Sequence, residues 1–259
     1  MQIIDPVNID STSSADTGIG VRCRQLSHSY STTPGSPKAL DDVSLDIRLG
    51  ELTLLVGPSG CGKTTLISII AGLLRPSAGS LEVMNQSLYE MRQSELLRLR
   101  LTTIGFIFQQ FNLMPGLTAA ENVAVPLIAA RRSFVESHRR ACVLLSQLGL
   151  SSYRDRYPRH LSVGQQQRVA IARALVHEPK LVLCDEPTAS LDSKGGGAVM
   201  TILKELAVGR DRAAIVVTHD PRVLEFGDRC LTMEDGRLIA DTAATELESA
   251  SSFSGGLST

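Results

Sequence analysis

Residues 57–65, with the sequence GPSGCGKTT, constrain the fold of this chain more than any other segment. An apolar run at residues 52–56 precedes them, and residues 66–71 have the composition of a helix. A glycine-rich loop that ends in Lys-[Ser/Thr] between a strand and a helix is the P-loop pattern. Its glycines let successive backbone N–H groups point at phosphate oxygens, and the helix N-terminus adds positive charge. We therefore expect a nucleoside triphosphate site here rather than a structural Gly/Ser turn between two core elements.

Each residue type in this loop has an expected contact. Lys63 is expected to reach the β- and γ-phosphates, and Thr64 is expected to place its hydroxyl on Mg²⁺. A thiol reagent on Cys61 is expected to block the nucleotide. The predicted nucleotide-binding residues of the loop are Gly57, Pro58, Ser59, Gly60, Cys61, Gly62, Lys63, Thr64 and Thr65.

Length and composition exclude several classes of protein. The 259 residues fit one large domain or a domain with a subdomain. A formal net charge of −1 does not mark a nucleic-acid binder, and we expect no nucleic-acid partner. Five scattered cysteines without a C-x-x-C pair argue for reduced thiols and against a disulfide scaffold or zinc site. Neither a secretory signal nor an apolar run of about 18 residues is present, so any membrane role is expected to act through a partner.

Apolar runs elsewhere in the chain predict the core. Residues 181–184 and 213–217 are continuous apolar runs, which fit parallel strands covered on both faces. A helical block over about residues 90–165 looks inserted within this α/β core. Residues 231–239 predict a hairpin with an Asp-Gly turn. The segments 1–19 and 242–259 are polar or Ser/Gly-rich, and both are interpreted as loose tails that flank one folded domain at residues 20–241.

Acidic residues and a histidine follow the two apolar runs directly. A carboxylate at the end of an apolar strand is the Walker B pattern, so Asp185 is the expected Mg²⁺ ligand. Glu186 is the candidate general base for an attacking water. His219 follows the second run, and strand ends in such sheets face the ligand crevice, so we expect it to sense the γ-phosphate. An acidic strand-to-loop transition and a structural histidine are the alternative interpretations.

Residues 161–175, LSVGQQQRVAIARAL, predict an N-capped amphipathic helix. Ser162 is a plausible N-cap, and residues 165–175 carry apolar side chains on one face. A Ser/Gly helix N-terminus can bind an anion, although an ordinary cap explains the same residues.

This stretch resembles the signature of ATP-binding cassette (ABC) ATPases, and six motifs in family order extend the resemblance over about residues 20–241. The loop at residues 57–65 is similar to the Walker A motif of the family, and Asp185-Glu186 is similar to its Walker B motif with the catalytic Glu. The other four motifs are the Q-loop at Gln109, the signature at Ser162, Val163, Gly164 and Gln165, the D-loop at Asp192 and the H-loop at His219. In addition, Tyr30 lies where the adenine-stacking aromatic residue of the family lies.

The resemblance implies a fold, cofactors and a mechanism. The fold is a P-loop NTPase (RecA-like) core with a parallel central sheet, an N-terminal antiparallel β subdomain and an inserted α-helical subdomain. The ligands are ATP and Mg²⁺, with Lys63, Gln109, Glu186 and His219 as catalytic residues and Thr64, Gln109 and Asp185 at the metal. Two copies of the chain form a homodimer with ATP at the interface, and the signature of one copy completes the γ-phosphate site of the other.

Two departures from regular patterns carry expectations of their own. The family usually has Gly where this chain has Val163, and a β-branched residue is strained at positive φ. Either the backbone there is ordinary or the loop is altered; we expect ATP hydrolysis at a moderate rate. Residues 195–197 are three glycines, each of which costs about 1 kcal/mol in a helix interior. We therefore expect the helix after Asp192 to start late or to be soft.

Residues 104–123 narrow the resemblance to the ATPases of lipoprotein-release, macrolide-export and glycolipid-export transporters. This subgroup implies an export complex with separate integral membrane permease subunits, and a peripheral location on the cytoplasmic face of the inner membrane. Residues 109–115 would contact the permease, while core packing explains Phe108, Phe111 and Leu113 equally well. The arginines at positions 131, 132, 139 and 140 would face anionic lipid headgroups or, in the simpler interpretation, solvent.

ABC cassettes also occur in two other functional classes. An ABC protein of DNA repair or translation is disfavoured, because this chain has one cassette and no heptad run. A regulatory ABC ATPase, which signals through a membrane partner and transports nothing, stays open as the alternative.

Overall fold

The computed structural model describes residues 18–31, 33 and 35–243, and most of the two predicted tails lies outside these residues. Strands reach slightly further than expected at both ends, because β1 begins at Ile19 and β10 ends at Ala243. Within the described part, no helix has the length and apolar character needed to cross a membrane.

In chain order the elements are β1 (Ile19–His28), β2 (Leu40–Arg48), β3 (Leu52–Val56), α1 (Lys63–Ile70), β4 (Ala78–Val83), β5 (Gln86–Ser87), α2 (Gln93–Thr102), β6 (Ile104–Ile107), α3 (Ala119–Ala129), α4 (Phe134–Gln147), η1 (Ser151–Tyr153), η2 (Pro158–His160), α5 (Val163–Leu175), β7 (Leu181–Asp185), α6 (Ser193–Ala207), β8 (Ala213–Val217), η3 (Pro221–Phe226), β9 (Arg229–Glu234) and β10 (Arg237–Ala243).

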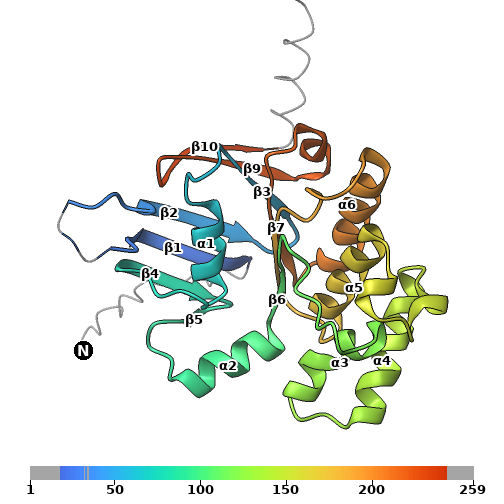
Figure 1. Cartoon of the computed structure of the whole chain (residues 1–259). Helices are drawn as coiled ribbons and strands as arrows, with labels where there is room; N and C mark the ends of the chain where they lie inside the picture. The colour runs from blue at the N-terminus through green and yellow to red at the C-terminus, as the bar shows by residue number, and fades with distance from the viewer. Residues whose placement is uncertain (1–17, 32, 34, 244–259) are drawn as a thin grey trace, which may run out of the picture.

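The strands form two sheets. One is antiparallel with the order β2-β1-β4-β5. The other has the order β10-β9-β3-β8-β7-β6, in which every pair is parallel except the β9–β10 hairpin at the edge. Figure 1 shows the antiparallel sheet and α1 on one side of the larger sheet, with α5 and α6 on the other side. The predicted α/β class, parallel core and N-terminal antiparallel β unit are confirmed.

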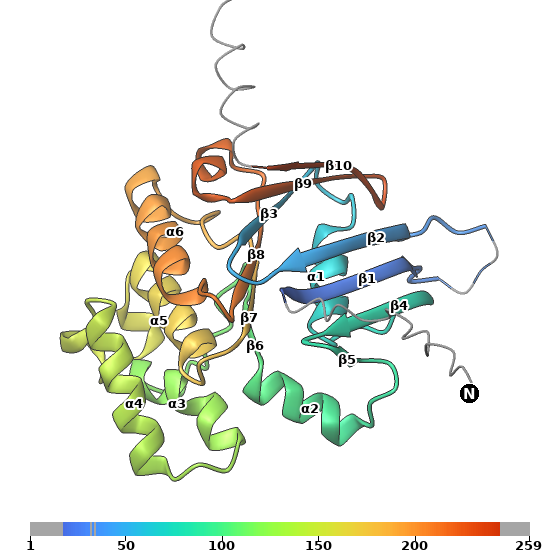
Figure 2. The ribbon, with the colours of Figure 1, turned by 180° about the vertical axis from the view of Figure 1, so that it is seen from behind.

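The central strands are buried on both faces, as their continuous apolar runs predict. All five residues of β7 and of β8 are buried. Successive side chains point to opposite faces of a strand, so Leu183 belongs to the cluster around α1, whereas Val182 and Cys184 belong to the cluster around α6. The view from behind in Figure 2 shows the same two layers of helix against this sheet. The core therefore lies on both faces of the larger sheet and fixes the positions of its strand ends.

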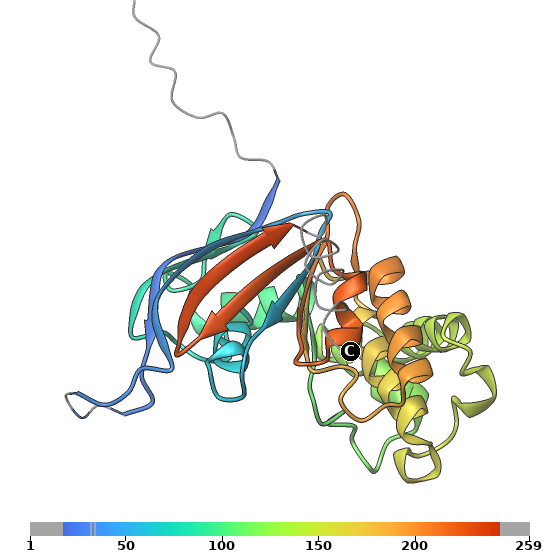
Figure 3. The same cartoon turned by 90° about the horizontal axis from the view of Figure 1, so that it is seen from above.

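The C-terminal hairpin adopts the predicted turn. Asp235 has φ 45° and Gly236 has φ 78°, so both central residues are left-handed, as a tight hairpin turn requires. The hairpin lies beside β2 (Figure 3), and the backbone N–H of Asp41 donates to the carbonyl oxygen of Gly236 at 2.9 Å. The hairpin therefore connects the larger sheet to the antiparallel sheet.

Helices α3, α4 and α5 pack around a third apolar cluster that includes Val123, Leu145 and Val169. The boundaries that we predict for this helical subdomain, about residues 90–165, stay a prediction. The late start that we expect for the helix after Asp192 is wrong, because α6 begins at Ser193 and contains all three glycines. That this helix is soft stays a prediction. The side chain of Asp192 accepts from the N–H of Gly195 at 2.8 Å, and a Cβ at Gly196 would lie 3.5 Å from Thr188. This cap and this close packing offset the low helix propensity of glycine.

Candidate nucleotide-binding and catalytic site

The carboxyl ends of β3, β6, β7 and β8 meet at one edge of the larger sheet, because these strands are mutually parallel. β3 leads into residues 57–65, and the other three strands lead to Gln109, Glu186 and His219. A groove of about 760 Å³ opens at this edge. It is lined by Tyr30, Pro37, Lys38, Ala39, Ser59, Gly60, Gly62, Lys63, Thr64, Thr65, Gln109, Glu186 and His219. Sequence reasoning missed Pro37, Lys38 and Ala39, which lie in a loop that no motif marks.

The loop at residues 57–65 requires glycine at two positions for steric reasons. Gly57 has φ 146°, and a Cβ there would lie 2.1 Å from the carbonyl oxygen of Met233. Gly62 has φ 104°, and its Cβ would lie 2.3 Å from the carbonyl oxygen of Ala39. Gly62 is also the N-cap of α1 and offers no side-chain cap, so the first N–H groups of α1 stay free of a side-chain acceptor. This backbone geometry suits an anion at the helix N-terminus.

Lys63 is buried beneath this loop. Only 6% of the surface of this residue is exposed to solvent. The ammonium Nζ donates to the carbonyl oxygens of Gly57 at 2.8 Å and Pro58 at 2.7 Å, and it lies 3.6 Å from the sulfur of Cys61. The positive charge is therefore held at the centre of the loop by neutral acceptors.

Thr64 and Asp185 connect the first helix to the end of β7. The hydroxyl of Thr64 donates to Oδ1 of Asp185 at 3.0 Å. Burial raises the pKa of the Asp185 carboxyl and outweighs the hydrogen bond from Thr64, which lowers it. Hydroxyl and carboxylate oxygens are the ligands that Mg²⁺ prefers, and this ion usually keeps several waters beside one or two protein ligands. The donor set of these two residues therefore fits Mg²⁺.

Glu186 is held by two other predicted residues. Nε2 of Gln109 donates to Oε2 of Glu186 at 3.3 Å, and Nδ1 of His219 lies 2.9 Å from Oε1. Because an ionised carboxylate only accepts, Nδ1 carries the hydrogen of that bond. Glu186 itself has φ 48°, which is uncommon for a residue other than glycine. Residues with such backbone angles are enriched at functional sites. Three of the four side chains that we predict for catalysis, from separate motifs, thus meet in one hydrogen-bonded group.

Tyr30 stands at the rim of the groove. Its hydroxyl lies within hydrogen-bond distance of Oγ1 of Thr65, at 3.0 Å, and 69% of the residue is exposed. Its ring and the ring of His28 pack nearly perpendicular to each other at a centroid distance of 4.8 Å. Tyr30 is therefore fixed at two points while the residue stays largely exposed, as a base-stacking platform needs.

The signature residues lie outside this groove of the single chain. Ser162 caps α5, with Gln165 N–H donating to the Ser162 hydroxyl at 3.3 Å and Oε1 of Gln165 accepting from Ser162 N–H at 2.9 Å. Helix α5 begins at Val163, two residues earlier than predicted, and Val163 is not among the residues with positive φ. The valine therefore adopts ordinary helical backbone. A Cβ on Gly164 would lie 3.8 Å from Leu191, which places the start of α5 beside the segment of Asp192.

The side chains of the segment at 104–115 contribute partly to packing. The ring of Phe108 packs on Phe106 at a centroid distance of 4.4 Å, and Leu113 packs against the third apolar cluster. Arg139 is exposed and Arg140 is half-buried, and both of these α4 side chains pair with Glu136, which is typical of a solvated helix face. These contacts support the simpler interpretations of both segments.

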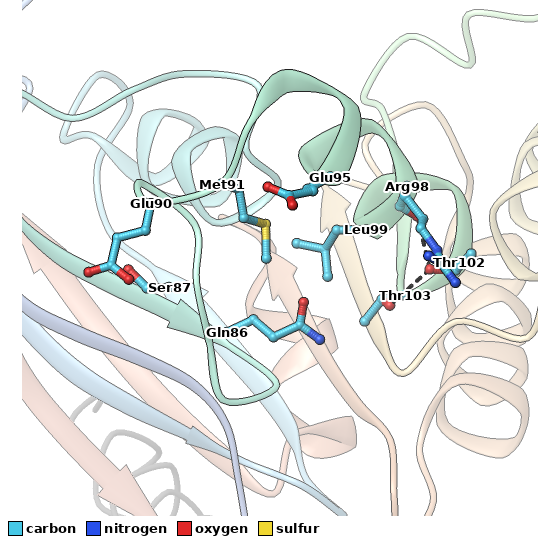
Figure 4. Close-up of a pocket in the computed structure, with 9 residues that line it drawn as sticks. All are labelled: Gln86, Ser87, Glu90, Met91, Glu95, Arg98, Leu99, Thr102 and Thr103. Atoms are coloured by element: carbon cyan, nitrogen blue, oxygen red, sulfur yellow. Dashed lines mark hydrogen bonds between the residues drawn. The ribbon is translucent and has the colours of Figure 1, made fainter.

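A second groove, of about 570 Å³, lies between β5 and α2 (Figure 4). It contains none of the predicted site residues. One of its carboxylates, Glu95, is already bound to the backbone N–H of Arg92 at 2.8 Å. Its lining residues are Gln86, Ser87, Glu90, Met91, Glu95, Arg98, Leu99, Thr102 and Thr103. The groove at the sheet edge is therefore the candidate site.

Comparisons with known proteins show which family this chain is similar to. A family model described as ABC transporter matches residues 40–189. The lipoprotein-releasing system ATP-binding protein LolD of Chromohalobacter salexigens is 40% identical over 90% of this chain and 98% of its own length. The macrolide export ATP-binding/permease protein MacB of Burkholderia thailandensis is 45% identical over 83% of this chain, which spans a third of that relative.

A solved structure shows the same fold. It is the dimeric structure of a post-hydrolysis state of the ATP-binding cassette MJ0796 bound to ADP and Pi. It superposes with a TM-score of 0.80 and 40% sequence identity, over 86% of this chain and 98% of that chain.

Proposed function

The chain belongs to the ABC transporter family, and from this premise we propose that it binds and hydrolyses ATP to power a separate membrane permease in an export complex. The observation that carries the proposal is the convergence of the residue 57–65 loop with Gln109, Glu186 and His219 in one groove. The relatives named for lipoprotein release and macrolide export support the export class. The location that follows is the cytoplasmic face of the inner membrane, held there by the permease.

The nucleotide is held by one wall of the groove. The ring of Tyr30 stacks on the adenine, and the N–H groups of residues 57–65 surround the phosphates. The ammonium of Lys63 turns from the carbonyl oxygens of Gly57 and Pro58 to the β- and γ-phosphates. The hydroxyl of Thr65 is within reach of the same phosphates, because Thr65 lies in the first turn of α1.

Thr64, Asp185 and Gln109 would hold Mg²⁺. When bound, the ion neutralises charge that develops on the phosphate oxygens. Hydrolysis then depends on Glu186, whose carboxylate accepts a proton from the attacking water. The water oxygen bonds to the γ-phosphorus as the bond to the bridging oxygen breaks, and ADP and phosphate leave. Gln109 and His219 keep the carboxylate aimed at that water.

The other wall of the site comes from a second copy of the chain. Ser162, Val163, Gly164 and Gln165 lie at a helix N-terminus outside their own groove, beside the segment of Asp192. A helix N-terminus stabilises negative charge that develops in the transition state. The dimer of the similar cassette supports a composite site of this kind, in which ATP closes two copies and hydrolysis opens them. Residues 109–115 would carry that change to the permease.

The experiment is to measure the Mg²⁺-dependent hydrolysis of ATP by the purified chain over a wide range of chain concentration. A composite site requires the activity per chain to rise with concentration until the dimer saturates. A constant activity per chain from a species that sediments as a monomer contradicts the composite site. Proteoliposomes that contain the chain and its permease then separate export from the regulatory alternative, because only an exporter moves a substrate when ATP is hydrolysed.

A further inference from the structure

The segment that follows Gln109 joins strand β6 to helix α3 and has no regular structure over residues 108–118. Its far end is organised by Asn122, which is fully buried. The side chain of Asn122 accepts from the N–H of Met114 at 2.7 Å and donates to the carbonyl oxygens of Met114 and Leu117 at 3.1 and 3.0 Å. Asn122 belongs to α3 itself, so these bonds order the end of the segment that is remote from Gln109.

The near end of the segment is held by Arg173, which comes from a different helix. Nη2 of Arg173 donates to the carbonyl oxygen of Phe111 at 2.7 Å, and Nη1 donates to that of Asn112 at 2.6 Å. Asn112 has φ 48°, a left-handed conformation that presents its carbonyl beside that of Phe111. Arg173 is part of α5, whose first turn carries Ser162 and Gly164, and α5 packs against both α3 and β6 (Figure 1).

The guanidinium of Arg173 donates hydrogen bonds to these two carbonyl oxygens. Among the described residues, no carboxylate forms an ion pair with it, and burial lowers the pKa of its guanidinium. Burying a cation without an acidic partner costs desolvation free energy. The planar guanidinium offsets this free energy through two hydrogen bonds to successive carbonyl oxygens, and both bonds form only when these carbonyl groups are held in a fixed geometry. Arg168 on the same helix makes a single longer contact, at 3.4 Å to the carbonyl oxygen of Leu148, away from this segment.

We propose that Arg173 is a positioning residue that holds Gln109 against Glu186 by fixing the carbonyl groups of Phe111 and Asn112 to helix α5. Gln109 lies two residues before Phe111, so its Cα stays within about 7 Å of the clamped residue. Its contact with Glu186, at 3.3 Å, is long enough to be lost with a small shift of the backbone. Because Ser162 caps the N-terminus of α5, the same clamp ties the position of Gln109 to the helix end that would meet the partner's nucleotide.

This inference rests on the proposed roles of Gln109 and Glu186. The experiment compares the full-length chain with the variants Arg173→Gln, Arg173→Lys, Gln109→Ala and the double variant Arg173→Gln/Gln109→Ala. Steady-state ATP hydrolysis gives kcat and the KM for ATP, and circular dichroism checks the fold. We expect Arg173→Gln to lower kcat about tenfold with KM changed less than about twofold, which is the signature of a group that acts on the chemical step. Arg173→Lys keeps the charge but not the fork, and we expect it to recover only part of the loss.

The double variant decides whether Arg173 acts through Gln109. If it does, the double variant has the kcat of Gln109→Ala alone, because the interaction has already been removed. If the two single-variant reductions in kcat multiply in the double variant, Arg173 acts by another route. An unchanged kcat in Arg173→Gln would overturn the inference outright. Arg168→Gln is the matched control on α5, for which we expect a kcat within about twofold of the parent. If Gln109→Ala itself has the parent kcat, the failure lies in the proposed role of Gln109 and not in the clamp.

Restoring the guanidinium without the side chain separates positioning from folding. Arg173→Ala leaves a gap at a half-buried site, and we expect added guanidinium ions at millimolar concentration to raise its kcat. Tetramethylammonium chloride at the same ionic strength serves as the control, since it cannot donate hydrogen bonds to the two carbonyls. Recovery with neither cation, in a variant whose circular dichroism matches the parent, would contradict a role for these hydrogen bonds.

Discussion

Nδ1 of His219 lies 2.9 Å from Oε1 of Glu186, although 33 residues separate them in the chain. The carboxylate side chain is mostly buried, whereas 60% of the histidine side chain is exposed toward the groove. The second carboxylate oxygen accepts from Gln109. Glu186 is thus oriented by one residue from the end of β6 and another from the end of β8, and only the packing of these strands against β7 brings the three together.

The first prediction concerns this carboxylate. Glu186→Gln keeps the shape and one acceptor oxygen, so we expect ATP to bind with an affinity close to that of the parent. The neutral amide cannot accept the proton of water, and we expect kcat to fall by a factor of about 10²–10⁴, the usual contribution of a general base. Because the nucleotide persists, size-exclusion chromatography in Mg²⁺ and ATP should show the chain as a dimer.

Asp155→Asn is the control for removing an exposed acid, because the Asp155 side chain is 76% exposed and makes only a weak ion pair with Arg154. We expect it to hydrolyse ATP at the parent rate. Hydrolysis at the parent rate by Glu186→Gln would show that another group accepts the proton.

The second prediction concerns Lys63. Lys63→Ala removes the cation from the centre of the loop and leaves the carbonyl oxygens of Gly57 and Pro58 without their donor. We expect productive nucleotide binding to be abolished, as measured by titration calorimetry with ATP. Lys38→Ala is the matched control in the same groove, since Lys38 is paired with Asp41 at 2.5 Å, and we expect a change of no more than about threefold in Kd. Unchanged affinity and turnover in Lys63→Ala would contradict the P-loop interpretation.

The parts of the site that could be predicted from the sequence share a physical reason. The conformation of residues 57–65 depends on residues that are neighbours in the sequence, because the glycines and the lysine lie in one short loop between a strand and a helix. Asp185 is predictable because it ends a buried apolar strand, and His219 is predictable because it comes after another; parallel strands end at one edge of the sheet. The β9–β10 hairpin was predicted because Asp235-Gly236 satisfies its turn locally.

The parts that could not be predicted depend on contacts between distant segments. Arg173 is separated from Phe111 by 62 positions in the chain and from Asn112 by 61. The pattern of apolar residues in a sequence does not predict which backbone carbonyl groups accept hydrogen bonds from such a distant side chain. Lys38 lines the groove because β2 lies beside the C-terminal hairpin.

The third prediction concerns Val163. Its backbone is helical, so Val163→Gly relieves no strain, and the hydrogen bonds between Ser162 and Gln165 do not involve its side chain. We expect kcat to stay within about threefold of the parent and the free energy of unfolding to fall by less than about 1 kcal/mol, the helix propensity difference. ATPase assays and urea unfolding measure the two effects. A rise in turnover above about tenfold, roughly 1.4 kcal/mol in the barrier, would show that valine impairs this signature.

The fourth prediction distinguishes the cysteines. Burial raises the pKa of the Cys23 thiol to about 12 and also raises that of Cys184, so we expect neither to react with iodoacetamide in the folded chain. Cys142 is partly exposed and should react first. Cys61 is part of the loop at residues 57–65 and is 4% exposed, so we expect it to react more slowly than Cys142. We expect Mg²⁺ and ATP to slow its labelling further, and we expect its alkylation to block ATP binding. Mass spectrometry of tryptic peptides measures each site, with Cys142 as the internal control that ATP leaves unchanged. Equal labelling of Cys61 with and without ATP would contradict a nucleotide over this loop.

The last prediction concerns the ion pair that joins β9 to β10. Nε and Nη2 of Arg229 donate to the two carboxylate oxygens of Asp241 at 2.7 and 2.5 Å, and the Arg229 side chain is largely buried. The hydrogen bonds from Arg229 lower the pKa of Asp241 below its ordinary value of 3.8. A carboxyl whose pKa is lower in the folded state stabilises the fold above the unfolded pKa, and this contribution is lost as the pH falls through the folded pKa.

We therefore expect Asp241→Asn to lower the free energy of unfolding at pH 7 by at most about 1 kcal/mol, since nearly half of the Asp241 side chain is exposed to solvent. The corresponding loss of thermal midpoint is about 4 °C or less. The difference from the parent should shrink as the pH falls below 3.8, where the parent carboxyl also becomes neutral. Asp211→Asn is the matched control, because Asp211 is 72% exposed and lies 3.9 Å from Arg212, too far for a strong pair. A difference between Asp241→Asn and the parent that stays constant from pH 7 to pH 3 would mean that the carboxyl contributes through packing rather than through charge.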